Sequence, residues 1–490
     1  MGYSAGFYFF RPGSDSSTMP PEFRETIMGM FDITGFGAIG DGKTNDAGAI
    51  RRAIDACAAS GGGTVLVPSG RTYVSGSIEL KSHVELCVER GAVLLGATRE
   101  EDYPAFAFKT GMEAGKRAWI VANGAEDVAI TGGGIIDGNS PAFTTRKGTL
   151  IHADTVPWRP AMTCLVGCRR VRIRDTVFRH AANWALHFSG CEDVVVDGVS
   201  VLNDLRFPNC DGIDPDHCRN VRISNCHIEA GDDCIVLKNT EPFASYGPCE
   251  NIVVTNCTLV STSSAIKIGT ESVCDFRNIV FENCVIRGSH RGLSIQIRDK
   301  GNVENVLFSN MTVETRFFGG GWWGSGEPIY VTSLPRNAAT DPGRIRNVRF
   351  TNIVCRSENG AFIMGHTPAH IRNVVLDGVR LCVGKWTKLE GGRYDVRPCP
   401  PDVRPFGSEP EGEVTPWGCR VRRTTPGIYV EKATGVTLRN TEVDWDGGEP
   451  AYYTHALEAR QAPGLLLDGF RGEAAHGARD QAVRVSGESE

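Results

Sequence analysis

The chain lacks the features that would place a protein in a membrane or on nucleic acid. Its 490 residues contain no run that approaches the roughly 18–20 apolar residues of a membrane span. The N-terminus, Met1 to Phe10, has neither the basic region nor the long apolar core of a secretory signal peptide. Lys and Arg form no long clusters and the net charge is −6, so bulk charge gives no support for a nucleic-acid or anionic-membrane partner.

A disulfide framework is not indicated either, although the chain has 17 cysteines. The number is odd, and several cysteines recur in one context, as in Asn225-Cys226, Asn256-Cys257 and Asn283-Cys284. Such positions are typical of small buried side chains, and free thiols fit a reducing compartment. We therefore expect a cytoplasmic protein, with secretion by another route left open.

A repeated phrase runs through the second half of the chain. It consists of an asparagine, a short alternating apolar run and, in most copies, a second asparagine before a small or apolar residue. The steps between copies are 31, 27, 27, 42 and 26 residues, and the copies start at Asn220, Asn251, Asn278, Asn305, Asn347 and Asn373. A period in the twenties with short β-branched strands predicts stacked β coils, because one coil alone has too little apolar surface to fold.

Stacking of the coils has further consequences. Strands of neighbouring coils pair at about 4.8 Å, and the recurring asparagines are expected to form a ladder of amide hydrogen bonds between coils. A leucine-rich horseshoe is the main alternative at this period, but its leucine spacing is absent. The longest step contains the glycine-rich segment 319–324, which predicts a protruding loop.

The first part of the chain contains an amphipathic segment. Residues 45–60 place their apolar side chains on one face, and glycines 61–63 follow. The apolar positions are Ile50, Ala53, Ile54 and Cys57. This pattern predicts a helix that caps the open edge of the first coil.

The composition also predicts how the chain is divided. Pro, Gly and charged residues dominate 385–426, which predicts an inserted loop. We expect one solenoid domain between two polar ends. The boundaries are an N-terminal extension at 1–28, the domain at 29–470 with its insertion, and a polar tail at 471–490.

Two short acidic turns are the best candidates for chemistry. Asp211 lies in Asn-Cys-Asp-Gly-Ile-Asp, and Asp232 and Asp233, in Gly-Asp-Asp-Cys, follow it after 21 and 22 residues. Because this spacing is nearly the repeat, stacking would bring three carboxyl groups together, as acid–base hydrolysis of a sugar linkage requires. Asp beside Gly is usually a turn residue that bonds the backbone, but two such elements one coil apart favour catalysis. Asp214 is predicted to be structural, because it should face another way.

With these motifs the chain resembles the polygalacturonases of glycoside hydrolase family 28. The segment 36–46, Phe-Gly-Ala-Ile-Gly-Asp-Gly-Lys-Thr-Asn-Asp, is similar to the opening motif of many such proteins, and the two acidic elements resemble the family's own. The resemblance covers most of the chain and implies a single-stranded right-handed parallel β-helix. It also implies inverting hydrolysis without a cofactor or a metal, with Asp232 as the general acid and with Asp211 and Asp233 activating water.

The chain departs from the family at the groups that recognise the sugar. Where the family has a histidine one coil after the acids, this chain has Ser264. Where the family binds the galacturonate carboxylate with Arg-x-Lys, it has Ser294 and Gln296. Displaced cations, Lys267 and Arg298, could supply the lost positive charge; otherwise the sugar in the cleavage subsite is neutral or a different uronide.

Further substrate-binding candidates come from their places in the sequence. They are Lys238, five residues beyond Asp233, the pair His290 and Arg291, and Trp322 with its neighbour Trp323 in the glycine-rich segment. For the cations the alternative is a solvated surface position, and for one of the two tryptophans it is the core. His187 and His217 are predicted to be hydrogen-bonded wall residues.

Three functions remain in competition at this point. The first is a hydrolase of pectin-derived or related galacturonate-containing oligosaccharides, exo-acting if it meets short imported fragments. A calcium-dependent polysaccharide lyase would use the same acids as ligands, and a non-catalytic carbohydrate-binding β-helix would leave three converging acids unexplained. The expected partner is an oligosaccharide, with no nucleic acid and no membrane, and the oligomeric state is open.

Overall fold

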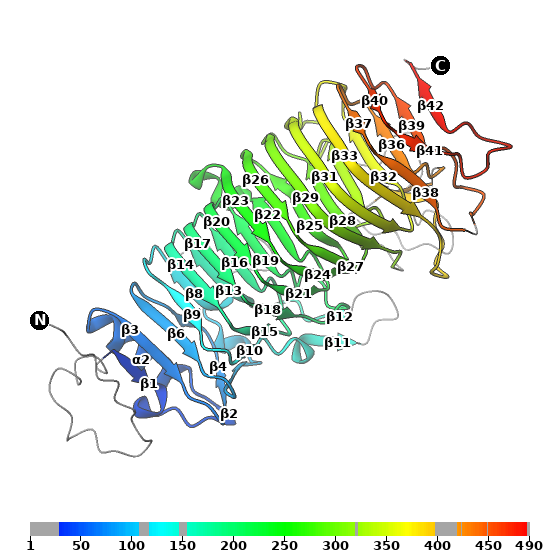
Figure 1. Ribbon diagram of the computed structural model, residues 1–490. Helices are drawn as coiled ribbons and strands as arrows, with labels where there is room; N and C mark the ends of the chain where they lie inside the picture. The colour runs from blue at the N-terminus through cyan, green and yellow to red at the C-terminus, as the bar shows by residue number, and fades with distance from the viewer. Residues whose placement is uncertain are drawn as a thin grey trace, which may run out of the picture.

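The computed structural model is an elongated column of stacked coils (Figure 1). It describes residues 29–106, 117–146, 154–318, 322–396, 419–422, 424–447 and 449–487. The predicted extension at 1–28 lies outside the described residues. In the part of the chain that is described, no helix has both the length and the apolar character needed to cross a bilayer.

Three ladders of parallel strands form the walls of the column. The first is a 13-stranded sheet that carries the candidate site. Its strands are β5 (Ile78–Glu79), β8 (Ala118–Asn123), β13 (Ala161–Val166), β16 (Leu186–Ser189), β19 (Ile213–Asp216), β22 (Ile235–Asn239), β25 (Ser264–Ser272), β28 (Arg291–Ile297), β30 (Ile329–Ser333), β32 (Ala361–Gly365), β36 (Ile428–Glu431), β39 (Leu457–Arg460) and β42 (Val483–Ser486).

The other two ladders belong to one 25-stranded sheet, because three long strands run through both. These are β29 (Val303–Thr315), β31 (Ile345–Ser357) and β33 (Ile371–Val383). The second ladder also contains β1 (Met30–Asp32), β3 (Gly63–Val67), β6 (Val84–Val88), β9 (Ala129–Thr131), β14 (Arg169–Arg174), β17 (Glu192–Asp197), β20 (Arg219–Ser224), β23 (Cys249–Thr255), β26 (Phe276–Glu282), β37 (Thr437–Arg439) and β40 (Leu466–Asp468). The third adds β2 (Asp41–Asn45), β4 (Thr72–Ser75), β7 (Val93–Gly96), β10 (Ile135–Asp137), β15 (Val177–Arg179), β18 (Ser200–Leu202), β21 (His227–Ala230), β24 (Thr258–Ser261), β27 (Val285–Ser289), β38 (Glu442–Trp445) and β41 (Arg471–Gly472).

Alternation within each strand builds the core. In β20 the side chains of Val221 and Ile223 are fully buried, and Arg222 between them is exposed. The strand register then places similar side chains on top of one another. The rings of Phe281, Phe308 and Phe350 stack with distances of 4.9 and 4.8 Å between ring centres. The predicted stacking of the coils is therefore confirmed.

The asparagine ladder is also confirmed. Asn251, Asn278 and Asn305 donate from Nδ2 to the Oδ1 of the asparagine one coil earlier, at 3.2–3.3 Å. Each has a positive φ, and asparagine is among the few residues that adopt the left-handed conformation readily. The repeated asparagine therefore sets the turn and joins neighbouring coils.

The predicted cap is the helix α2 (Ala47–Ala59), which lies at the N-terminal end of the column (Figure 1). It buries Ile50, Ala53, Ile54 and Cys57, the face that the sequence pattern identified. The cysteines from Cys57 to Cys382 are unpaired, and all of them but Cys87, Cys274 and Cys382 are buried, as expected for small apolar side chains.

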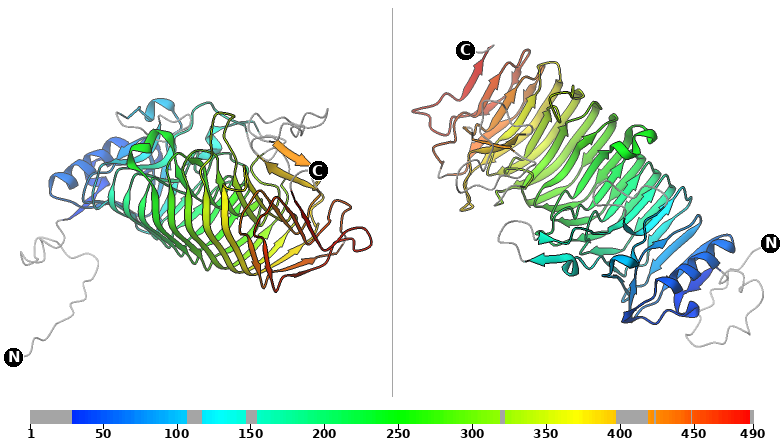
Figure 2. Two further views of the ribbon diagram at one scale, coloured as in Figure 1. Left: turned by 90° about the horizontal axis from the view of Figure 1, so that it is seen from above. Right: turned by 180° about the vertical axis from the view of Figure 1, so that it is seen from behind.

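Two segments differ from the sequence prediction. The insertion at 385–426 contains β34 (Arg393–Val396), which pairs antiparallel with β35 (Cys419–Arg422) outside the column (Figure 2, left). The polar tail continues the coils instead, because β41 and β42 add to two ladders. The remaining short elements are η2 (Ile33–Phe36), η3 (Glu100–Asp102), η4 (Ser140–Phe143), η5 (Glu241–Tyr246) and the antiparallel pair β11 (Thr144–Arg146) and β12 (Asp154–Thr155).

Candidate active site

The three predicted acids meet on neighbouring coils, just before strands β19 and β22 in the middle of the 13-stranded sheet. Asp211 ends the turn before β19, and Asp232 and Asp233 form the turn before β22. The two turns are joined by the backbone, because the Gly212 N–H donates to the Asp233 carbonyl at 2.9 Å. One oxygen of each carboxyl group lies within 4.8 Å of the others. Stacking thus brings the three side chains together.

Two glycines allow this close approach of the turns. A Cβ at Gly231 would lie 2.3 Å from the Phe207 carbonyl oxygen. A Cβ at Gly212 would lie 2.4 Å from the Cys234 carbonyl oxygen. Any side chain at either position would therefore push the coils apart and separate the acids.

Asp233 is held as a carboxylate. Its Oδ2 accepts from Lys267 Nζ at 2.7 Å, and its Oδ1 accepts from Ser263 Oγ at 2.8 Å and from the Ser264 N–H at 3.0 Å. Burial by itself would raise the pKa of Asp233, but the ammonium groups of Lys267 and Lys238 hold this pKa below its usual value. Asp233 is therefore the member of the three that loses its proton most readily.

The pKa values of the other two acids are raised, that of Asp232 further than that of Asp211. Burial, together with the charges of Asp211 and Asp233, raises the pKa of Asp232 well above its usual value. Burial also raises the pKa of Asp211 to about 6, although Lys238 opposes the shift. The site therefore combines an acid that keeps its proton with a base that has lost it, which is the division that acid–base catalysis needs.

Asp214 corrects the sequence prediction, because it faces the site. It lies on β19 in register with His187, its side chain is fully buried, and its Oδ1 is 3.6 Å from Lys238 Nζ. Burial and the neighbouring Asp211 raise the pKa of Asp214 well above its usual value. Asp214 is thus a fourth acid of the cluster and shares a cation with Asp211.

Lys238 connects this cluster to a second group of charges. Its Nζ lies 3.4 Å from Asp211 Oδ2, 3.9 Å from Glu271 Oε2 and 4.5 Å from the centre of the Trp184 ring. Burial opposes ionisation of Glu271, but Lys238 and Arg336 lower its pKa to about 2. Glu271 and Arg336 carried no motif, so sequence reasoning missed them.

Lys267 lies against one of the two tryptophans. The Lys267 ammonium, which bonds Asp233, lies 4.7 Å from the centre of the Trp323 ring. Trp322, the residue chosen from the sequence, is half-buried beside it. The ring that contacts a cation of the site is therefore that of Trp323, and not that of Trp322.

Arg291 is not placed to read a substrate carboxylate, because acids already surround it. Its fully buried guanidinium donates from Nε to Glu327 at 3.3 Å, and its Nη2 lies 3.6 Å from Asp395 Oδ2. The same group stacks at 3.6 Å from the centre of the Tyr330 ring. Asp395 comes from the insertion, so no local pattern could have predicted this ion pair.

The remaining candidates lie around this core. His290 is buried, with its ring 5.5 Å from that of Phe318. Arg298 donates from Nη2 to the Arg336 carbonyl at 3.4 Å. His187 bonds Asp216 and Ser189, and His217 bonds backbone carbonyls, as predicted for wall residues.

Three neutral polar groups occupy the positions where the resembling family has charged ones. Ser264, Ser294 and Gln296 are at most 1% exposed. Within the described residues, Ser264 Oγ, Ser294 Oγ and Gln296 Nε2 have no hydrogen-bond partner in the protein. Ser294 lies next to Lys267 in the sheet register. Buried groups of this kind require a partner from a ligand or from solvent.

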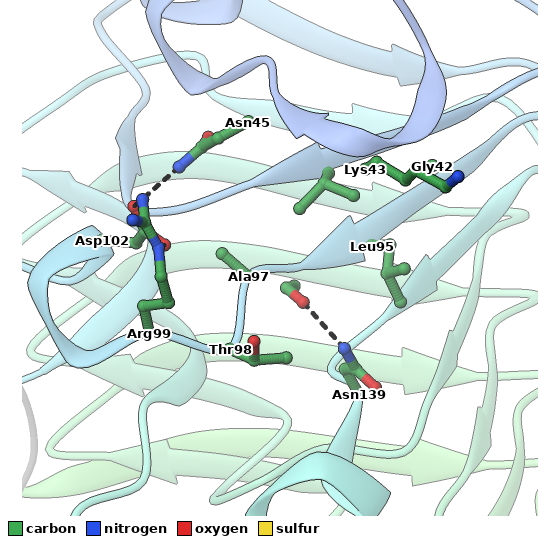
Figure 3. A pocket seen from close by; sticks show the side chains of 11 residues that line it. Gly42, Lys43, Asn45, Leu95, Ala97, Thr98, Arg99, Asp102 and Asn139 are labelled. Atoms are coloured by element: carbon green, nitrogen blue, oxygen red, sulfur yellow. Dashed lines mark hydrogen bonds and ion pairs between the residues drawn. The ribbon is translucent and has the colours of Figure 1, made fainter.

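A separate cavity of about 320 Å³ lies on coils nearer the N-terminus (Figure 3). Asp102 accepts from Asn45 at 2.8 Å on one wall, and Asn139 donates to the Gly96 carbonyl at 3.1 Å on another. Its lining residues come from β2, β4, β7 and the segments that follow β7 and β10. The cavity shares no residue with the acid cluster and is a different place on the solenoid.

Comparison with known proteins connects this arrangement to one family. The model of glycosyl hydrolases family 28 matches residues 57–389. A probable polygalacturonase of Vitis vinifera is 31% identical over 255 residues, which cover 49% of this chain and 51% of that protein. An exo-poly-alpha-D-galacturonosidase of Dickeya chrysanthemi is 26% identical over 268 residues, 45% of this chain and 44% of that protein. The chain thus spans about half the length of these curated relatives.

Solved structures agree on the fold. An exopolygalacturonase from Thermotoga maritima superimposes with a TM-score of 0.62 at 23% identity, covering 75% of this chain and 90% of that one. A family 28 exopolygalacturonase from Yersinia enterocolitica gives 0.66 at 20% identity, covering 94% and 79%. Both are right-handed parallel β-helices, which confirms the predicted fold class.

Proposed function

The chain belongs to glycosyl hydrolases family 28, and we propose that it hydrolyses glycosidic bonds in galacturonate-containing oligosaccharides. The observation that carries this proposal is a cluster of three carboxyl groups with oxygens within 4.8 Å of one another. In this cluster the pKa of Asp232 is raised and the pKa of Asp233 is lowered. Relatives named as polygalacturonases, including exo-acting ones, support the substrate class.

In the proposed reaction Asp232 is the general acid and gives its proton to the oxygen of the leaving sugar. Asp233, ionised by Lys267, takes a proton from the water that attacks the anomeric carbon, and Asp211 helps to hold that water. The bond from the anomeric carbon to the leaving oxygen breaks as the bond to water forms. One turnover therefore returns the proton to Asp232 through solvent and inverts the anomeric centre.

The spacing of the acids makes the stereochemistry a direct test. The nearest oxygens lie within 4.8 Å, whereas the carboxyl groups of inverting enzymes are typically about 6.5–9.5 Å apart and those of retaining enzymes about 5–5.5 Å. Following the anomeric protons of the first product by NMR distinguishes the two outcomes. The short spacing by itself favours retention, whereas the roles proposed for Asp232 and Asp233 require inversion. A retained product would therefore remove Asp233 as the base that activates water.

Recognition of the sugar is proposed to use neutral groups. Lys267 is bound to Asp233 and Lys238 to Asp211, so both lysines are already engaged with the acids. Among the described residues, Ser294 Oγ and Gln296 Nε2 have no hydrogen-bond partner, whereas Gln296 Oε1 accepts from Arg291 Nη1 at 3.4 Å. The hydroxyl and the amide N–H suit sugar hydroxyl groups. This supports a neutral sugar in the cleavage subsite, next to galacturonate units.

Product analysis by mass spectrometry on homogalacturonan, rhamnogalacturonan and neutral side-chain oligosaccharides tests the proposal, with wild type and Asp232→Asn side by side. A saturated monosaccharide that disappears with Asp232→Asn supports exo-hydrolysis and identifies the sugar. An unsaturated product would make the protein a lyase. No turnover of any substrate, with binding retained, would refute the enzymatic function.

The calcium-dependent lyase has less support. Lys267 and Lys238 already neutralise Asp233 and Asp211, and a divalent cation would have to displace both ammonium groups. We also propose a cytoplasmic location, which is supported by the unpaired thiols of the cysteines from Cys57 to Cys382.

A further inference from the structure

The insertion is joined to the 13-stranded sheet through one buried arginine. Arg291 lies on β28 and has no exposed surface. It donates to both oxygens of Glu327, at 3.3 and 3.4 Å, and lies 3.6 Å from Asp395 of β34. One cation thus joins the sheet, the turn that follows β29 and the insertion, three segments that are distant in sequence.

Asp395 also holds that turn directly. Its Oδ2 accepts the Gly324 N–H at 3.1 Å, and its backbone carbonyl accepts from the Tyr330 hydroxyl at 2.7 Å. A further side chain, Asn359, donates to the Arg393 carbonyl at 2.8 Å and to the Ser325 carbonyl at 2.9 Å. The strand of the insertion and the turn at 322–326 are therefore fixed to each other.

The turn in question carries the tryptophan of the site. Trp323 immediately precedes Gly324, and its ring lies 4.7 Å from Lys267 Nζ, which bonds Asp233 at 2.7 Å. Gly324 has a φ of +99°, and a Cβ there would lie 3.1 Å from the backbone of His290. The turn thus has a tight, specific conformation, and Asp395 bonds it next to the ring.

We propose that Asp395 is a positioning residue for the acid site: it keeps the turn at 322–326 closed, so that Trp323 covers Lys267 and Lys267 stays on Asp233. Covering the ammonium excludes water and strengthens its attraction to the carboxylate. The catalytic consequence rests on the proposed function, whereas the contact from Asp395 to Trp323 does not.

The first experiment needs no activity. Acrylamide quenching of Trp323 is obtained as the difference between wild type and Trp323→Phe, and it is repeated in the Asp395→Ala background. We expect stronger quenching of Trp323 in Asp395→Ala, and unchanged quenching in Glu390→Gln, an exposed acid of the same insertion. Equal quenching of Trp323 in wild type and Asp395→Ala would overturn the proposal.

The second experiment measures coupling in kcat/KM. Asp395→Ala removes a hydrogen bond to a charged group and is expected to lower kcat/KM roughly 10-fold or more. Trp323→Ala removes the cover of Lys267 and is expected to lower kcat/KM to a similar extent. If the two residues act in series, the double variant loses about the same roughly 10-fold factor instead of about 100-fold. Additive losses would overturn the proposal.

A conservative variant and a pH profile separate positioning from general stabilisation. Asp395→Asn keeps an oxygen that accepts the Gly324 N–H, so this variant should recover most of the activity. Asp395→Ala should move the acidic limb of the pH–rate profile to higher pH, because Lys267 and Asp233 lose the cover of Trp323. An unmoved limb in a folded, less active Asp395→Ala would overturn the proposal. A wild type inactive on every oligosaccharide would refute the proposed function, and the quenching result would still decide the role of Asp395.

Discussion

Replacing Lys267 by methionine removes the ammonium group that bonds Asp233 and keeps a side chain of similar length. The two groups are 2.7 Å apart, and Lys267 and Asp233 are 3% and 1% exposed. Ser263 Oγ and the Ser264 N–H would still bond Asp233 Oδ1, but Oδ2 would face an apolar side chain. The variant therefore asks how much of the ionisation of Asp233 depends on this lysine.

The cost follows from leaving one charge buried alone. Removing one partner of a buried ion pair typically destabilises a protein by about 3–5 kcal/mol. The folded protein can reduce this cost by protonating Asp233, so the pKa of Asp233 should rise in Lys267→Met. In wild type this pKa is below its usual value, so the ion pair stabilises the fold above the pH where an unfolded aspartate titrates, about 3.9. That stabilisation is lost as the pH falls through the folded pKa.

Thermal unfolding and pH–rate profiles measure the two consequences. The melting temperature of Lys267→Met should lie furthest below that of wild type near pH 7, and the difference should shrink below about pH 4. Because Asp233 acts as a base, the acidic limb of kcat should move to higher pH. Lys300→Met, at an exposed lysine after β28, is the control and should change neither. A melting deficit independent of pH, with an unmoved limb, would refute the assignment of Asp233 as a lysine-stabilised base.

Three further outcomes are expected. Glu271→Gln should lower the melting temperature fully above about pH 4.5, and the deficit should vanish toward pH 2, because Lys238 and Arg336 lower the pKa of Glu271 to about 2. Incubation with EDTA should leave hydrolysis unchanged if the carboxyl groups act as acid and base, and its abolition with recovery by Ca²⁺ would favour a metal-dependent lyase. Asn278→Ala should destabilise the fold by roughly 1–2 kcal/mol in denaturant unfolding, because alanine disfavours the left-handed conformation; Asn278→Gly, which accepts it, should lose less.

The coils and the three central acids could be predicted because their causes are local and repeated. Each copy of the asparagine phrase sets a turn of the same conformation, and the apolar residues between the asparagines alternate with the pleat. A spacing of 21–22 residues is about one coil, so stacking of the coils brings Asp211 close to Asp232 and Asp233. The helix cap is equally local, since its apolar face is visible in 13 consecutive residues.

Asp214 was predicted to face another way because it lies three residues beyond Asp211. Asp211 lies in the turn before β19, where the direction of a side chain is set by the turn and not by the pleat. Within β19, Ile213 points into the core, so Asp214 points outward, on the same face as Lys238. Counting from the buried isoleucine would have placed Asp214 at the site.

Asp395 could not have been found in this way, because its position depends on where a long insertion returns. The hydrogen bond from Gly324 to Asp395 spans 71 residues, and residues 385–426 contain no repeat that fixes a register. What fixes it is an ion pair with Arg291, whose residue type suggested a substrate contact. A buried cation in a repeat protein thus has two explanations, a ligand or an inserted segment, and only the partner found in three dimensions decides between them. Here Glu327 and Asp395 both pair with Arg291. The arginine that the sequence suggested for substrate binding therefore holds the insertion and the turn at 322–326 in place.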